Sequence, residues 1–282
     1  MAGLNRQSSM RKQSPGPIEH RPVSDFLPGF VSAEILPELM RSYELDRSWL
    51  IRNTPTITQT DVKLFCELVN SGEEPYLMAA LAALRSQGLS PQQLLLDLLT
   101  QVAQELGRRW TSDDADFSSV TIALGHLQSL RRTITQFDTP GLQPFGPPRR
   151  ALLATTPGDQ HDFGVMIVDH FMHLAGWDVR TCPGSSAEEI ISLVSKNSFE
   201  ITGLSLSCES YLMSLERLVS TIRKVSKNSE IGILVGGPLF LERPELALLI
   251  GADATAQDAK DAVRQAETIA SRNGAVSVKA ME

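Results

Sequence analysis

The stretch "ALLATTPGDQHDFGVMIVDHFMHLAG", residues 151–176, decides the fold that the sequence predicts for the second half of the chain. Its first five residues form a short apolar run, and residues 164–176 repeat apolar side chains at helical spacing. A buried strand that leads through a loop into a helix is the start of a βαβ unit. The loop between them carries Asp159, His161 and Gly164, which a plain connection of this length does not need.

The same alternation continues to the end of the chain. Further strand-like runs occupy 177–182, 200–207, 230–237 and 252–255, and helical runs occupy 186–197, 210–227, 243–251 and 256–272. This order predicts a Rossmann-like (flavodoxin-like), doubly wound parallel sheet of five strands over 150–272, with 273–282 as a C-terminal tail. Such folds bind ligands at the carboxyl ends of their strands, which is where the loop at 156–164 is expected.

The region from 30 to 137 is expected to form a helical-bundle cap, so the fold class is α + α/β. Apolar residues recur every three or four positions in five segments, and the Leu-rich run at 92–99 is expected in the bundle core. Ser90 and Pro91 are typical of a helix start. Residues 138–149 contain four prolines and two glycines and are expected to be a linker.

Composition limits the partners. A net charge of −7 argues against a protein that binds nucleic acid on its own. Residues 1–25 are polar and mildly basic, which predicts a disordered tail and leaves weak or indirect DNA contact open. The start lacks the apolar stretch of a secretory signal, and no apolar run is long enough for a bilayer, so we expect a cytoplasmic protein without membrane contact. Cys66, Cys182 and Cys208 are too scattered for a disulfide framework.

Common ligands of this fold class lack their motifs. No GxGxxG follows the first strand, no GxxxxGK[ST] occurs, and no GxSxG elbow is present. A phosphorelay receiver needs a phosphorylated Asp after a later strand, but the third strand ends in "SLSCES". The loop at 157–161 instead supplies a titratable base, His161, where the nucleotide-binding folds supply glycines.

Three motifs stand in order at expected strand ends: DxHxxG at 159–164, SxS at 205–207 and GG at 236–237. This trio resembles the DxHxxG…SxL…GG signature of cobalamin-binding domains of the methionine synthase and methylmalonyl-CoA mutase class. The resemblance implies that a histidine ligates cobalt from below, with an Asp and a Ser hydrogen-bonded behind it, and that glycines admit the nucleotide tail of the cofactor. The candidate cofactor contacts are accordingly Asp159, Gln160, His161, Gly164, Ser205, Ser207, Gly236 and Gly237, with His161 as the metal ligand.

The residue types suit that chemistry. A neutral imidazole is a good cobalt ligand, and a carboxylate behind its second nitrogen fixes the tautomer. The preceding helices resemble the cap of methionine synthase and of B12-dependent photoreceptor regulators, in which a Trp stacks on the upper corrin face. Trp110 occupies the matching place. The Glu-His pair of those regulators is missing, and the cap's only histidine, His126, is expected on a helix surface.

A narrower resemblance covers about residues 60–270. "PGDQHDFG" (157–164), together with "DFSSVTIALGHLQ" (116–128), resembles the AerR/PpaA antirepressors of purple photosynthetic bacteria. That family implies a light sensor without enzymatic activity, which carries adenosylcobalamin or its hydroxo/aquo photoproduct and binds a repressor of the CrtJ/PpsR type. Two alternatives stay open: a corrinoid carrier of a methyltransferase system, and a haem- or redox-sensing relative on the same fold.

The sequence contains other side chains of types that can bind metals. His170 and His173 lie three apart with Asp169, but we expect surface and packing roles because no third helix-borne ligand is evident. Cys208 could line the crevice, and a buried structural thiol is the preferred expectation.

Overall fold

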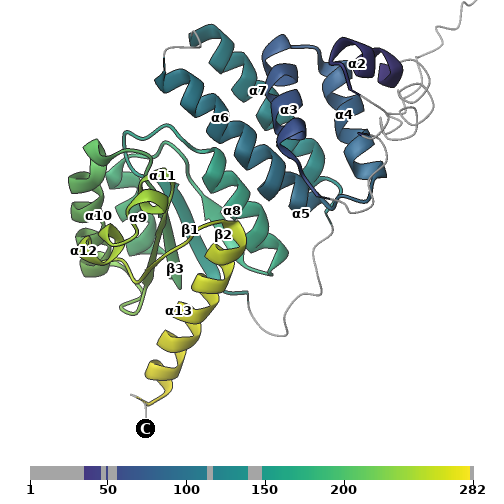
Figure 1. Cartoon of the computed structure of the whole chain (residues 1–282). Coiled ribbons are helices and arrows are strands. Elements are labelled where there is room, and N and C mark those ends of the chain that lie inside the picture. Colours follow the sequence, from purple (N-terminus) through teal and green to yellow (C-terminus); the bar gives the residue numbers. More distant parts are fainter. Residues whose placement is uncertain (1–34, 46–48, 50–55, 113–116, 139–147, 280–282) are drawn as a thin grey trace, which may run out of the picture.

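The computed structural model describes residues 35–45, 49, 56–112, 117–138 and 148–279, with a helical cap beside a sheet domain (Figure 1). Neighbouring strands of the sheet are all parallel and pair in the order β2-β1-β3-β4-β5. This confirms the predicted doubly wound sheet. The strands are β1 (Arg150–Thr155), β2 (Asp178–Thr181), β3 (Ile201–Ser205), β4 (Gly232–Gly236) and β5 (Ala254–Thr255).

Helices cover both faces of the sheet. On one face, Leu152 and Ala154 of β1 share a core with the helices that follow β2 and β3, and on the other, Ala151 and Leu153 pack with the helices that follow β1 and β5. This alternation follows from the period of two along a strand. The helical elements are α8 (Phe163–Leu174), α9 (Ala187–Lys196), η5 (Glu209–Tyr211), α10 (Leu212–Val225), α11 (Pro238–Glu242), α12 (Leu246–Leu249) and α13 (Ala259–Lys279).

Two helices near the C-terminus differ from the prediction. The helical run expected at 243–251 shrinks to α12, and α11 precedes it, because Gly237 and Pro238 start a short helix directly after β4. The final helix does not stop at 272 but continues to Lys279 through Gly274, at a helical cost of only about 1 kcal/mol for the glycine. Most of the expected C-terminal tail is therefore helical.

The cap is a bundle whose helices begin at residues with clear start signals. The Thr58 hydroxyl and the Asp61 carboxylate form a capping box, and Ser90 forms another with Gln93. The buried side of each helix joins one continuous apolar cluster. The elements are α2 (Leu36–Ser42), α3 (Gln59–Ser71), α4 (Glu74–Ser86), α5 (Pro91–Gln93), η4 (Leu94–Leu99), α6 (Thr100–Thr111) and α7 (Phe117–Thr135).

The Leu-rich run lies in the bundle core, as predicted. Leu94, Leu95, Leu98 and Leu99 are fully buried. The run is π-helical (η4) between α5 and α6, and the Thr100 hydroxyl donates to the carbonyl of Leu95 at 3.1 Å. The sequence pattern shows no sign of this local change, because buried leucines with the exposed Asp97 between them satisfy either helical geometry.

The cap and the sheet domain share one apolar interface. Ile167 and Phe171 of α8 and Ala259 of α13 are buried in the cap's cluster, and Phe163 packs against it. These residues include the first turns of α8 and α13, which follow the carboxyl ends of β1 and β5. The cap is therefore fixed near the edge of the sheet where this fold class binds ligands. A polar contact joins α8 to the residues after the cap, with His170 Nε2 3.1 Å from Asp138 Oδ2.

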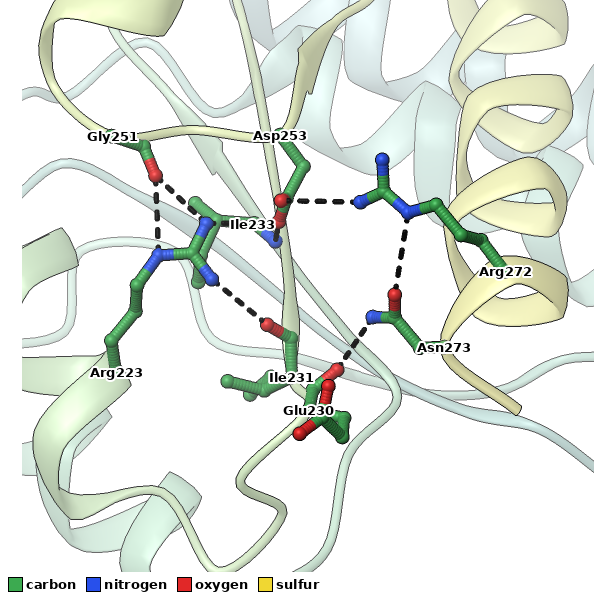
Figure 2. Close-up of polar contacts among 8 residues, drawn as sticks. All are labelled: Arg223, Glu230, Ile231, Ile233, Gly251, Asp253, Arg272 and Asn273. Atoms are coloured by element: carbon green, nitrogen blue, oxygen red, sulfur yellow. Dashed lines mark hydrogen bonds and ion pairs between the residues drawn. The ribbon is translucent and has the colours of Figure 1, made fainter. Parts of the chain in front are cut away.

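A polar network ties together the opposite, amino-terminal edge of the sheet (Figure 2). Asp253 Oδ2 accepts from the Ile233 amide at 2.7 Å and from Arg223 at 2.9 Å, and its Oδ1 lies 3.4 Å from Arg272. Arg223 also donates to the carbonyls of Gly251 and Ile231. This network joins α10 and α13 to the starts of β4 and β5.

Two predicted segments lie outside the described residues: the tail at 1–25 and most of the linker at 138–149. Within the part of the chain that the structure describes, no helix combines the length and apolar character that crossing a membrane requires.

Candidate functional site

The sheet register brings the three sequence motifs to one edge. Thr155 at the end of β1 is the register partner of Ser205, which is in turn the partner of Gly236. Beyond the last pairs, the amide and the hydroxyl of Thr156 both donate to the carbonyl of Ser205 at 2.8 Å. The Leu206 amide donates to the carbonyl of Gly236 at 2.9 Å. The strand ends thus form a continuous hydrogen-bonded base for the loops above them.

The loop after β1 places His161 on Asp159. The Asp159 side chain is 1% exposed, and its Oδ1 lies 2.7 Å from His161 Nδ1 and 3.0 Å from the His161 amide nitrogen. Its Oδ2 accepts from the Ser207 amide at 2.6 Å. Burial alone raises the pKa of Asp159, but the hydrogen bonds from His161 and Ser207 outweigh burial and lower the pKa to about 2. The carboxyl group is therefore ionised at neutral pH.

An ionised carboxylate sets the tautomer of the histidine. Because Asp159 can only accept, Nδ1 of His161 carries the proton, and the neutral ring presents a lone pair at Nε2. The bond to Asp159 raises the pKa of His161, against the opposing effect of burial. The His161 side chain is 74% exposed, so Nε2 belongs to an accessible ring. This is the arrangement of a metal-ligating histidine with its outer carboxylate.

The predicted glycines have different surroundings at this edge of the sheet. A Cβ on Gly164 would meet nothing within 4 Å. Gly237 has a φ of +99°, and a Cβ there would lie 2.5 Å from the carbonyl oxygen of Leu206 and 2.8 Å from the Ser205 hydroxyl. Only glycine fits at that position. Gly236 approaches the carbonyl of Ala256, which lines a hollow of about 530 Å³ together with Thr255 and Phe240.

The other predicted contacts differ in what their side chains contact. Ser207 acts through its backbone amide on Asp159, whereas the Ser205 hydroxyl lies against Gly237. Gln160 is exposed beside His161. Trp110 is the second-last residue of α6 and is 45% exposed, an unusual state for a Trp in a bundle whose other apolar residues are mostly buried.

Sequence reasoning missed two residues of the loop. Thr156 joins the ends of β1 and β3 through two hydrogen bonds, and Gly158, with a φ of +94°, packs against the ring of Tyr211. The letters "PGD" at 157–159 are a turn signal, which could have marked Gly158. Tyr211 stands 53 positions away along the chain from Gly158, and no local pattern links them.

The three other histidines of the described residues make structural contacts. His126 Nδ1 lies 2.8 Å from the carbonyl oxygen of Val69, so His126 is partly buried and joins α7 to α3 instead of lying on a free helix surface. His170 packs at the cap interface, and His173 Nδ1 lies 3.0 Å from the carbonyl oxygen of Asp169. The preferred expectation of a buried thiol at Cys208 is wrong. Cys208 is exposed, because it leaves β3 at the open edge.

Comparisons with known proteins agree with this geometry. Residues 149–267 match the family model of the B12 binding domain. The fold is similar to that of the monomethylamine corrinoid protein of Methanosarcina barkeri, with a TM-score of 0.60, 14% sequence identity, and coverage of 74% of this chain and 98% of that one. The residues that match this family model include all five strands of the sheet.

The chain is also similar to a protein whose genomic position is known. The chain is 24% identical over 174 residues to the "Uncharacterized 20.5 kDa protein in bchF-crtJ intergenic region" of Rhodobacter capsulatus, a match that covers 62% of this chain and 90% of the relative. The name of this relative records its genomic position between bchF and crtJ.

Proposed function

We propose that the chain is a cytoplasmic, cobalamin-dependent light sensor that regulates transcription by binding a repressor of the CrtJ/PpsR type. The observation that carries the cofactor assignment is the exposed imidazole of His161, which buried Asp159 holds at 2.7 Å through Nδ1 so that Nε2 is left for cobalt. The corrinoid is adenosylcobalamin or its hydroxo/aquo photoproduct, and the chain performs no catalysis of its own.

The described residues fit such a group. His161 would hold the metal, and Gly164 and Gly236 would let the cofactor come near the backbone. Gly237 is required by its contact with Leu206, and Trp110 offers an exposed ring from the cap. Ser205 and Gln160 lie at the same edge as further polar contacts. When bound, cobalamin would supply a cobalt centre that absorbs visible light.

The cap connects the site to a partner surface. Trp110 is part of α6, whose buried side belongs to the same apolar cluster as Ile167 and Phe171 of α8. A change in what lies beneath Trp110 therefore alters how the cap packs on the sheet domain. Signalling requires that the repressor binds the two packings with different affinity.

The name of the R. capsulatus relative supports the choice of partner, because it places that protein beside crtJ. The net charge of −7 favours action through a protein, with DNA contact only weak or indirect.

One experiment tests the proposal. The purified full chain is loaded with adenosylcobalamin in the dark, and its absorption spectrum and its binding to the repressor are measured before and after illumination. We expect a corrinoid spectrum that changes with light, together with a change in repressor affinity. A corrinoid spectrum with light-independent repressor binding would refute the sensor role, and a Soret band after expression with both cofactors would instead identify a haem protein.

A corrinoid carrier is the second candidate, favoured by the fold similarity to a methanogen corrinoid protein. A carrier delivers methyl groups to methyltransferases. It would show reduction to Co(I) and methyl transfer in the dark, with no light-dependent repressor binding.

A further inference from the structure

The short helix η5 (Glu209–Tyr211) holds an aromatic ring against the turn that precedes Asp159. A Cβ built on Gly158 would lie 2.8 Å from Cε1 of Tyr211 and 3.3 Å from its Cδ1 and Cζ. The edge of the ring therefore touches the backbone of Gly158 with no room for a side chain between them. Gly158 also has a φ of +94°, which other residues rarely adopt.

The segment from Ser207 to Tyr211 contacts two adjacent residues of the loop after β1. The Ser207 amide donates to Oδ2 of Asp159 at 2.6 Å, and Tyr211 packs on Gly158, the residue before it. The loop itself closes a turn at this point, since the Asp159 amide donates to the carbonyl of Thr156 at 2.9 Å. The backbone and the carboxylate of the same turn are thus fixed from one side.

Tyr211 rests on rigid support. Together with Leu212 it packs against the buried core between the sheet and helices α9 and α10. Glycine has more backbone freedom than any other residue, so Gly158 needs an outside contact to hold a single conformation. A metal-ligating side chain must be held within about 0.5 Å of its productive position. Contacts that fix the residues behind it, such as that of Tyr211 with Gly158, hold it there.

We propose that Tyr211 is a positioning residue that holds the Gly158 turn closed and thereby sets Asp159 and the His161 imidazole for the metal. The proposal rests on the proposed cobalamin site, which supplies the metal. The ring, not the hydroxyl, does the positioning, because the contact with Gly158 is made by ring carbons. A phenylalanine therefore replaces Tyr211 without loss.

The test compares Tyr211→Ala and Tyr211→Leu with Tyr211→Phe, and uses Met213→Ala, a 64% exposed neighbour, as the matched control. Amide hydrogen exchange is first measured on cobalamin-free protein. We expect Tyr211→Ala and Tyr211→Leu to exchange about 10-fold faster at Asp159, His161 and Ser207, with β3 and β4 unchanged, because only the turn is released. Tyr211→Phe and Met213→Ala should match the wild type. The leucine variant keeps apolar bulk against the core and replaces the alanine variant if that one does not fold.

Cobalamin binding is then measured on the same proteins. The alanine and leucine variants should bind about 10-fold more weakly, with a visible spectrum shifted toward that of free cobalamin, whereas phenylalanine restores the wild-type spectrum. Unchanged exchange at the loop, or faster exchange across the whole sheet, would overturn the positioning role. A wild-type chain that takes up no cobalamin would overturn the proposed function, and the exchange data would still decide what Tyr211 does to the loop.

Discussion

Asp253 and Asp159 lie at opposite edges of the same sheet. Each accepts a backbone amide on one carboxylate oxygen, but the side chains that they bind differ. The amide nitrogen lies 2.7 Å from the oxygen of Asp253 at the amino edge and 2.6 Å from that of Asp159 at the carboxyl edge. Asp253 then binds Arg223 and Arg272, which anchor α10 and α13 (Figure 2). Asp159 binds His161, whose side chain is 74% exposed.

The two aspartates differ in where their hydrogen bonds lead. Around Asp253, Arg223 also donates to two backbone carbonyls, so its hydrogen-bonding capacity is used to join elements. Around Asp159, the bonds end at a ring whose second nitrogen stays accessible. We therefore expect changes at Asp253 to lower stability, and changes at Asp159 or His161 to lower cofactor affinity.

The largest effect is expected from His161→Ala. Removal of the ring deletes the proposed metal ligand, and cobalamin affinity should fall by more than the roughly 10–100-fold that loss of an outer partner costs. The melting temperature of the cobalamin-free protein should change little, since the side chain is mostly exposed. Spectrophotometric titration and thermal unfolding measure the two quantities. His173→Ala, on the same domain, is the control, and wild-type affinity in His161→Ala would remove His161 from the site.

Asp159→Asn tests the carboxylate behind the ring. The amide can no longer enforce a proton on Nδ1, so we expect cobalamin affinity to fall by roughly 10–100-fold with the fold retained. Titration of the variant with cobalamin gives the number. A loss as large as that of His161→Ala, combined with unfolding, would mean that Asp159 serves the fold as Asp253 does.

Asp253→Ala should have the opposite pattern. It leaves the Ile233 amide without its side-chain acceptor and removes one of the three acceptors of Arg223, so we expect the free energy of unfolding to drop by about 1–3 kcal/mol. Cobalamin affinity of the folded protein should stay at the wild-type value. Urea denaturation followed by circular dichroism, with cobalamin titration alongside, makes the comparison. Weaker binding without destabilisation would break the distinction between the two edges.

A smaller effect concerns the cysteines. Burial raises the pKa of the Cys66 thiol to about 11, so it should resist alkylation at pH 8, whereas exposed Cys208 at the carboxyl edge should react at least about 10-fold faster. Mass spectrometry after brief iodoacetamide treatment identifies the labelled residue. Equal labelling of both thiols would show that the cap opens on the timescale of the reaction.

The architecture and the pairing of Asp159 with His161 could be predicted from the sequence because both depend on local patterns. Strand–helix alternation predicts the sheet, and DxHxxG places Asp159 and His161 two residues apart in one loop. Contacts that depend on tertiary packing could not be predicted from the sequence. The Ser207 amide leaves no mark in the sequence, since every residue except proline has one, and the ring of Tyr211 reaches Gly158 from another strand end.

The surroundings of His126 and Cys208 were mispredicted for a similar reason. A helix surface was expected for His126, yet Nδ1 contacts the carbonyl of Val69, a contact decided by how α7 packs on α3. The expectation of a buried Cys208 followed the general tendency of free cysteines, and the open edge of the sheet overrides that tendency.

The assignment of His161 Nε2 to cobalt is tested most directly by electron paramagnetic resonance of the Co(II) form of the loaded protein, prepared with ¹⁵N-labelled histidine. Coordination by His161 predicts that the axial nitrogen splitting changes from a triplet in unlabelled protein to a doublet in labelled protein, and that the doublet disappears in His161→Ala. A triplet that persists in the labelled protein would show that the cofactor's own base remains on the metal, and would contradict the account.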